Sequence, residues 1–264
     1  MINDGLNTIQ IKDYSVPFIK YGHGNKPIIM IPGLSYIMIP GQVERRKLNS
    51  EPYTNEFTCY YIERRPNLHE GYSTRQMAED VYDFICALGL KQVYVQGVSQ
   101  GGMIAQWLAI DHPEVVKALV LTVTMSKPNE TIKETTKWLK ILKSGDPKGA
   151  LEYMQKGSFS KKWLEEHKFD PIELPSEEAA RPLDQYEILQ KACLTHNCYL
   201  GLSNIKCPTL VNGGWEDGVV SGEASIEIAE KLKCDLHMDA GLGHGLNEED
   251  PNYHKRVCEW LLHY

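Results

Sequence analysis

Short apolar runs alternate with amphipathic segments along the first 125 residues of the chain. The apolar runs are bounded by glycine, proline or charged residues, as buried strands are, and the segments between them repeat apolar residues at helical spacing. This pattern predicts strands at 8–11, 16–21, 28–31, 57–62, 93–95 and 118–123, and helices at 74–88 and 101–111. Ser73 and Gln76 form a capping-box pattern before the first helix. Strands that alternate with helices predict a parallel sheet covered on both faces.

The pattern changes between residues 126 and 203, where helical spacing is interrupted by frequent turn residues. We expect helices there at 132–142, 148–155, 161–167 and 184–195. Strand patterns return at 207–211 and 235–238, with helices at 222–232 and 252–262. The segment 126–203 holds 12 basic and 12 acidic residues, so the net charge of −7 belongs to the flanking parts. We interpret 126–203 as a helical insertion that forms a lid over the sheet, with 1–125 and 204–264 as the core. Four further surface helices are the alternative.

Composition narrows the class of protein. The chain has 28 Lys and Arg against 35 Asp and Glu, a balance that argues against a nucleic-acid binder. No apolar run approaches the roughly 18 residues that a membrane span needs, and the start of the chain does not resemble a signal peptide. The seven cysteines include no C-x-x-C pair, which favours a reduced chain. We therefore expect a cytoplasmic protein with a small-molecule substrate and no membrane partner. Nothing in the sequence indicates its oligomeric state.

The strongest chemical signal is the G-x-S-x-G pattern from Gly97 to Gly101, which follows a predicted strand and precedes a predicted helix. A tight turn of this kind lifts the central serine, Ser99, into an exposed and strained position, as in a nucleophile elbow. A glycine-rich phosphate-binding turn is the alternative. A P-loop is excluded because Gly102 is followed by Met103 where that motif requires lysine. We predict that Ser99 is a nucleophile.

A serine hydroxyl needs a base, and the base needs an acid that orients it. His244 lies in a glycine-rich loop after the last predicted strand, so we expect it to be the base. His237 falls inside that strand and His254 on the last helix, and both are weaker candidates.

The orienting acid is expected after the strand at 207–211, where the chain offers two adjacent carboxylates. Asp217 is preferred because its shorter side chain suits the end of a strand and because Gly218 permits a sharp turn. Glu216 is the alternative, and Glu130 is the next candidate if neither serves.

These segments together resemble the α/β-hydrolase superfamily, and in particular its capped serine hydrolases such as carboxylesterases, enol-lactonases and carbon–carbon bond hydrolases. The resemblance is carried by five segments: 31–34, 97–101, 112–114, 214–217 and 243–244. It implies an α/β fold with a mostly parallel eight-stranded sheet, helices on both faces and a helical cap.

The resemblance also implies an oxyanion hole. Its backbone N–H donors would be those of Gln100, directly after the nucleophile, and Leu34, in the loop after the strand at 28–31. Fixed amides suit this role because they need no reorientation as charge develops. Pro32 stands where many members of the superfamily have histidine, so the resemblance does not predict which hydrogen bonds support this loop.

The resemblance predicts hydrolysis of a small to medium ester, lactone or thioester through an acyl-enzyme on Ser99. A carbon–carbon bond hydrolase, an iminopeptidase-like amidase and a non-catalytic ligand sensor on the same fold are the alternatives. No H-E-x-x-H or comparable metal-ligand spacing occurs, and no metal or cofactor is predicted. Trp215 is expected near the mouth of the pocket. Further lining candidates in the insertion are Trp138, Tyr153, Met154, Phe159, Trp163, Tyr186 and Tyr199.

Overall fold

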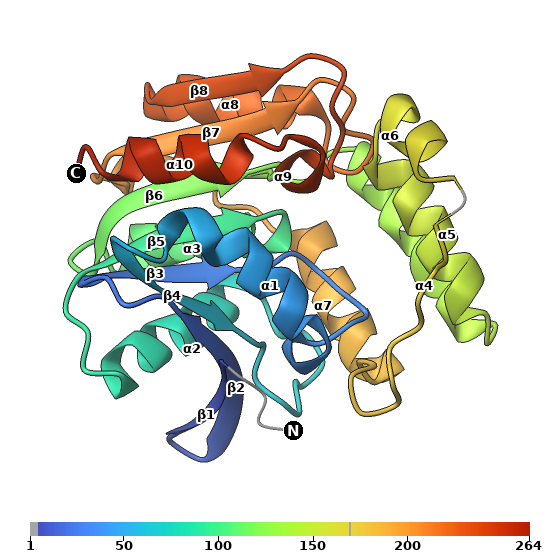
Figure 1. Ribbon diagram of the computed structural model, residues 1–264, viewed down its shortest axis with the longest axis horizontal. Coiled ribbons are helices and arrows are strands. Elements are labelled where there is room, and N and C mark those ends of the chain that lie inside the picture. Colours follow the sequence, from blue (N-terminus) through green and yellow to red (C-terminus); the bar gives the residue numbers. More distant parts are fainter. Residues whose placement is uncertain (1–4, 169) are drawn as a thin grey trace.

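The fold is built on one twisted sheet of eight strands (Figure 1). The computed structural model describes residues 5–168 and 170–264, so residues 1–4 of the predicted core and residue 169 of the predicted insertion lie outside the described part. The strands are β1 (Leu6–Ile11), β2 (Tyr14–Tyr21), β3 (Lys26–Ile31), β4 (Phe57–Ile62), β5 (Val93–Val98), β6 (Val116–Thr122), β7 (Thr209–Gly214) and β8 (Asp235–Asp239). Their order across the sheet is β1-β2-β4-β3-β5-β6-β7-β8. Only the β1–β2 and β2–β4 pairs are antiparallel, which confirms the predicted mostly parallel sheet.

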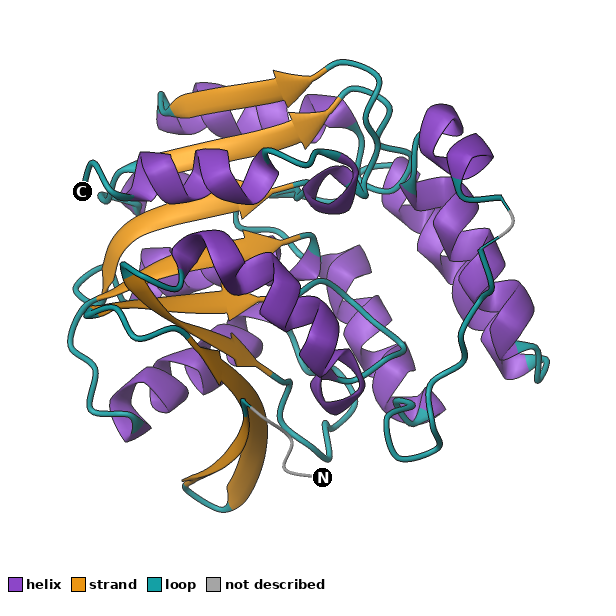
Figure 2. Ribbon diagram, in the orientation of Figure 1, coloured by secondary structure: helices purple, strands orange, loops and turns teal. Residues whose placement is uncertain are grey.

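Helices cover both faces of this sheet (Figure 2). They are α1 (Val43–Ser50), α2 (Thr74–Ala87), α3 (Gln100–Asp111), α4 (Thr135–Lys143), α5 (Pro147–Ser158), α6 (Lys161–Glu166), α7 (Leu183–Thr195), α8 (Gly222–Leu232), α9 (Leu246–Glu249) and α10 (Tyr253–Leu261). Side chains of β3 alternate between the two faces, as the period of a strand requires. Ile29 packs into the apolar cluster that includes α2, α3 and α8, and Ile28 into the cluster that includes α10. The sheet is therefore buried on both sides.

The parallel strands bring the loops that follow them to one edge of the sheet. In sequence, helices α4, α5, α6 and α7 all lie between β6 and β7. Helix α7 contributes Leu189 and Ala192 to the main core, whereas α4 and α5 pack against each other and belong to smaller apolar clusters. In Figure 1 the α4–α6 layer stands across from the ends of the parallel strands. Ligands of open α/β sheets bind at this edge.

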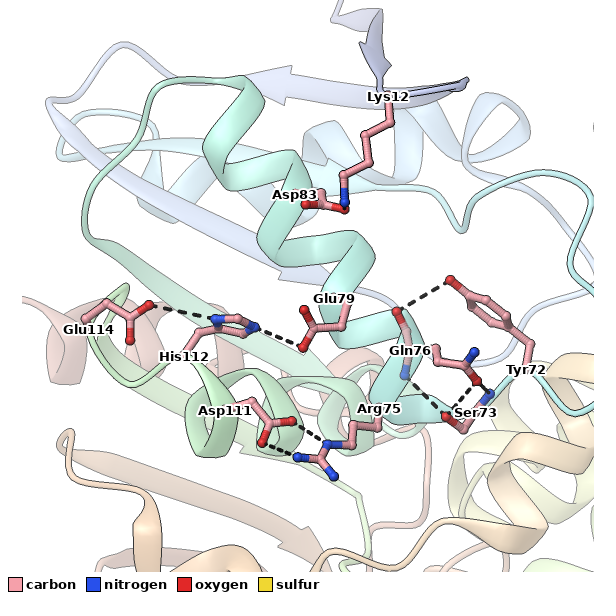
Figure 3. A network of polar contacts seen from close by, with 10 residues as sticks. All are labelled: Lys12, Tyr72, Ser73, Arg75, Gln76, Glu79, Asp83, Asp111, His112 and Glu114. Atoms are coloured by element: carbon pink, nitrogen blue, oxygen red, sulfur yellow. Dashed lines mark hydrogen bonds and ion pairs between the residues drawn. The ribbon is translucent and has the colours of Figure 1, made fainter.

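The start of α2 shows how local signals in the sequence set the boundary of an element (Figure 3). Ser73 Oγ accepts a hydrogen bond from the Gln76 N–H at 3.2 Å, and the Gln76 side chain accepts from the Ser73 N–H at 2.9 Å, so the predicted capping box is present. Arg75 pairs with Asp111 at 2.7 Å and thereby joins α2 to the end of α3. Among the described residues, no helix is long and apolar enough to cross a membrane.

Candidate active site

Ser99 sits on the turn between β5 and α3 in a backbone conformation that few residues adopt. Its φ is 53° and its ψ is −119°, which is a strained combination for a residue with a Cβ. The turn is held by the Ser99 N–H, which donates to the Thr122 carbonyl at 2.9 Å. A Cβ on Gly97 would collide with the Gly101 carbonyl, and one on Gly101 would collide with the Ile31 carbonyl. The two glycines of the motif are therefore required by close backbone approach.

Ser99, His244 and Asp217 form one continuous chain of hydrogen bonds. His244 Nε2 lies 2.9 Å from Ser99 Oγ, and His244 Nδ1 lies 2.9 Å from Asp217 Oδ2. A carboxylate can only accept, so the proton of a neutral imidazole lies on Nδ1 and leaves Nε2 free to accept the serine proton. Three residues that are far apart in the sequence thus meet in the order that a nucleophile, a base and an orienting acid require.

Asp217 is buried and fixed by the chain that follows it. It lies three residues beyond the end of β7, and its Oδ1 accepts from the Val219 N–H at 2.8 Å and from the Val220 N–H at 2.9 Å. Its neighbour Glu216 is exposed. The turn therefore directs one of the two adjacent carboxylates toward His244 and the other toward solvent.

His244 lies on the loop between β8 and α9, and this loop contacts the end of α5. The Gly245 N–H donates to the Ser158 carbonyl at 2.7 Å, and a Cβ on Gly243 would collide with the same carbonyl. The other two candidate histidines point elsewhere. His237, on β8, pairs with Asp239 at 3.0 Å. His254, on α10, lies 3.4 Å from the Tyr53 hydroxyl.

A cleft of about 330 Å³ opens directly over Ser99 and His244. Leu34 lines it from the loop after β3, and Gln100 is fully buried at the first position of α3. Within the described residues, neither the Leu34 N–H nor the Gln100 N–H donates a hydrogen bond to another group. The two amides that the resemblance implies as oxyanion donors therefore have no acceptor within the described residues.

The opposite wall of the cleft comes from the segment 126–203. Four of the seven side chains proposed from the sequence line it, namely Trp138, Met154, Phe159 and Trp163. Tyr153, Tyr186 and Tyr199 do not. Trp215 is 54% exposed and also lies outside the lining residues.

Comparisons with known proteins agree with this geometry. A model of the alpha/beta hydrolase fold family matches residues 49–162. The solved structure of MGS-M2, an alpha/beta hydrolase from a deep-sea metagenome library of the Medee basin, superposes with a TM-score of 0.82 at 19% identity and covers 98% of each chain. The chain has the α/β-hydrolase fold, and the family model supports its membership of that superfamily.

Two further proteins that resemble this chain carry names that state a reaction. The enol-lactonase of Burkholderia xenovorans LB400 has a TM-score of 0.80 at 15% identity and covers 97% of this chain and 100% of its own. A protein of Variovorax paradoxus, provisionally named carbamate hydrolase RutD, is 26% identical over 181 residues, which are 67% of this chain and 68% of that protein. These names and the family model support a hydrolase.

Behind the catalytic turn, this hydrolase carries a buried polar network that the sequence analysis missed. Arg64 is 7% exposed, and its guanidinium donates to the Pro32 carbonyl at 2.6 Å and to Gln100 Oε1 at 3.3 Å. Glu63 pairs with Arg181 at 2.8 Å, with both side chains buried.

Glu63 is the acceptor that holds the two sides of this network together. Its Oε1 also accepts from the Arg64 N–H and its Oε2 from the Ile39 N–H, both at 2.6 Å. Burial raises the pKa of Glu63, but the Arg181 guanidinium and these amides outweigh it and hold the pKa below its usual value. Arg181 in turn donates to the Ser35 carbonyl at 2.9 Å. The charged run Glu63-Arg64-Arg65 directly after a buried strand is the feature of the sequence that could have indicated this network.

No group of three or more His, Cys, Asp or Glu side chains within residues 5–168 and 170–264 is arranged to hold a metal ion.

Proposed function

We propose that this hydrolase cleaves a small to medium carboxylic ester, lactone or thioester through an acyl-enzyme on Ser99. One observation carries the proposal: the hydrogen-bonded chain from Asp217 through His244 to Ser99 ends at the floor of a cleft. Separate residues of this kind occur on many protein surfaces, but their alignment beneath a cavity is what acyl transfer requires.

In the proposed mechanism, His244 Nε2 takes the Ser99 proton as Oγ attacks the substrate carbonyl. Asp217 stabilises the imidazolium that forms, and its two amide hydrogen bonds hold it in place. The N–H groups of Leu34 and Gln100 stabilise the charge that develops on the carbonyl oxygen. His244 then gives its proton to the leaving group. A water molecule next attacks the acyl-enzyme while His244 takes its proton, and His244 returns that proton to Ser99 Oγ as the acid product leaves.

We propose further that residues 126–203 act as a cap that sets substrate choice. Helices α4–α6 supply one wall of the cleft, and Phe159 and Trp163 stack there with ring centroids 3.9 Å apart. An apolar wall over the nucleophile excludes water and favours an apolar acyl or leaving group.

Carbamate hydrolysis is the second candidate, and the name of the Variovorax relative favours it. The same three residues serve both reactions because each begins with attack on a carbonyl carbon. A panel of matched esters, lactones, carbamates and amides would separate the two by their ratios of kcat/KM.

The decisive experiment is the variant Ser99→Ala. We expect it to lose on the order of 10⁴-fold or more in kcat while it keeps the unfolding midpoint of the wild type, because members of a triad act as a unit. Release of p-nitrophenol from a short-chain ester and labelling by a fluorophosphonate probe are the two readouts. A variant with near wild-type kcat would overturn the proposal. Labelling of the wild type without turnover would indicate a ligand sensor.

A further inference from the structure

Two arginines on α1 face the same cleft but differ in their partners. Arg45 and Arg46 both line it, and so do the acidic residues Glu173 and Glu248. Arg45 forms an ion pair with Glu248, so their charges cancel. Arg46 has no carboxylate within ion-pair distance among the described residues. Arg46 and Glu173 are thus the two charged side chains of the cleft lining that form no ion pair among the described residues.

The side chains around Arg46 satisfy neither its charge nor all of its N–H groups. Its guanidinium donates to Gln42 Oε1 at 2.5 Å and lies 5.3 Å from the centre of the Tyr61 ring. Its Nε is buried without an acceptor, and Arg46 also lines a second cavity of about 20 Å³, which is large enough for one water molecule. A water molecule can accept from Nε–H, but it cannot neutralise the guanidinium.

The carboxylate that acts on Arg46 is already engaged by another guanidinium group. Glu63 lies in the field of Arg46 but forms its ion pair with Arg181 at 2.8 Å. Burial lowers the pKa of Arg46, and Tyr61 and Glu63 offset this only in part. An incompletely compensated guanidinium at the edge of a cavity favours the binding of an anion.

We propose that Arg46 binds an anionic group of the substrate, a carboxylate separate from the scissile bond. The substrate class is then an ester or lactone with an apolar portion against α4–α6 and a negative charge toward α1. This inference rests on the proposed hydrolase function.

Paired p-nitrophenyl esters test it with the wild-type enzyme alone. Mono-p-nitrophenyl adipate carries a distal carboxylate, and p-nitrophenyl heptanoate has an ethyl group in its place. A suberate monoester and its neutral counterpart extend the series to a longer chain. We expect kcat/KM for one anionic ester to exceed that of its neutral partner by about tenfold or more, the effect of one charge-assisted hydrogen bond. Equal values at both lengths would overturn the inference. Hydrolysis of none of these esters would instead overturn the proposed function.

Variants then locate the effect. Arg46→Met and Arg46→Gln are expected to abolish the preference for the anion, so that the ratio of kcat/KM for the anionic ester to that for the neutral ester falls to about one. The matched control is Arg45→Met/Glu248→Gln, which removes one cation and one anion together and should keep the preference. Two different substitutions are used so that the test still stands if one of the variants fails to fold. A preference that persists in either folded variant would contradict the assignment of Arg46.

A second inference rests on different contacts. We infer that Arg64 is a positioning residue for the oxyanion hole, because one guanidinium joins both segments that carry its donors. Its contact with the Pro32 carbonyl fixes the peptide chain just before Gly33 and Leu34. Its contact with the Gln100 side chain fixes the start of α3, where Gln100 also donates to the Leu189 carbonyl at 2.7 Å. The separation of the two donor amides therefore depends on Arg64.

Kinetics separate this role from a merely structural one. We expect Arg64→Met to lower kcat by about tenfold to a hundredfold with KM within about threefold, since donors displaced by a fraction of an ångström lose most in the transition state. Affinity for a trifluoromethyl ketone analogue of the ester should fall by the same factor as kcat/KM. Fluorophosphonate titration of Ser99 normalises the rates to the folded enzyme.

The neighbouring Arg65 provides the matched control. Its guanidinium lies 4.0 Å from the centre of the Tyr14 ring, away from the cleft lining, so Arg65→Met should keep kcat within about threefold of wild type. Arg64→Lys is a second variant that disturbs the fold less because it keeps the buried positive charge. A lysine lacks the planar guanidinium group that donates to both the Pro32 carbonyl and Gln100 Oε1. Normalised kcat and analogue affinity at wild-type levels in Arg64→Met or Arg64→Lys would overturn the inference.

Discussion

At the scale of single residues, the site combines strain with tight hydrogen bonding. Ser99 has positive φ, and the turn is held by the Ser99 N–H bond to Thr122 and by the glycine contacts around it. Asp217 makes three hydrogen bonds and keeps only 7% of its surface exposed. These hydrogen bonds fix both carboxylate oxygens of Asp217 in position. The geometry of the triad is therefore set before any substrate binds.

The two adjacent carboxylates lead to a prediction about the orienting acid. In Asp217→Asn, the amide oxygen is expected to keep the Val219 and Val220 N–H bonds, which leaves the NH₂ group facing His244 Nδ1. The imidazole must then carry its proton on Nε2 and cannot accept one from Ser99. We expect kcat to fall at least about a hundredfold, roughly 3 kcal/mol in the barrier.

Glu216→Gln is the matched control because it removes the exposed neighbour. We expect kcat to change by less than about tenfold, measured with the same ester at saturating concentration. The reverse order of effects would transfer the role to Glu216. Small effects from both would leave the base without an identified acid, because Glu130 is exposed and pairs with Lys133 at 2.7 Å.

At the scale of elements, the strands and long helices could be predicted from periodicity and capping. The helix over 222–232 coincides with α8, and α2 begins directly after Ser73, as expected. The prediction missed α1 because Val43–Ser50 is dominated by charged and polar side chains with no apolar stripe. That omission had a consequence for the site, because α1 carries Arg45 and Arg46. The zero net charge of the insertion gave no hint of an ionic substrate, and the cation lies on the helix that was missed.

The triad and the supporting network differ in how far the sequence could predict them. Ser99 and His244 lie in short motifs after strands, so topology brings them to one edge. Arg64 and Arg181 are separated by more than a hundred residues, and nothing local in either indicates that they share the Glu63 region. Such contacts depend on the packing of α7 against the loop after β3, which no periodicity encodes.

At the scale of the whole molecule, overall and local charge have opposite signs. The chain carries a net charge of −7, yet two guanidinium groups, those of Arg64 and Arg181, are buried with one carboxylate, Glu63, beside the loop after β3. Salt screens exposed charges beyond roughly 10 Å, whereas buried groups are screened much less. These buried charges therefore keep their effect at high salt, while the negative surface affects the rate of approach of an anion.

Stability as a function of pH gives the last prediction, and it concerns a histidine outside the catalytic chain. His196 follows α7, is 2% exposed and contacts the Thr74 hydroxyl through Nδ1 at 2.8 Å. Burial lowers its pKa from 6.5 to about 3. Below pH 6.5 the unfolded chain therefore binds a proton that the native protein does not, so the free energy of unfolding falls as the pH decreases. Between pH 7 and pH 5 this one residue should lower the free energy of unfolding by about 2 kcal/mol.

Urea unfolding at both pH values tests this. The free energy of unfolding should decrease less in His196→Asn than in the wild type, by about that amount, because an amide does not titrate in this range. His263→Asn, at an exposed position, should retain the wild-type decrease. An equal decrease in His196→Asn and in the wild type would show that His196 is protonated in the native state at pH 5.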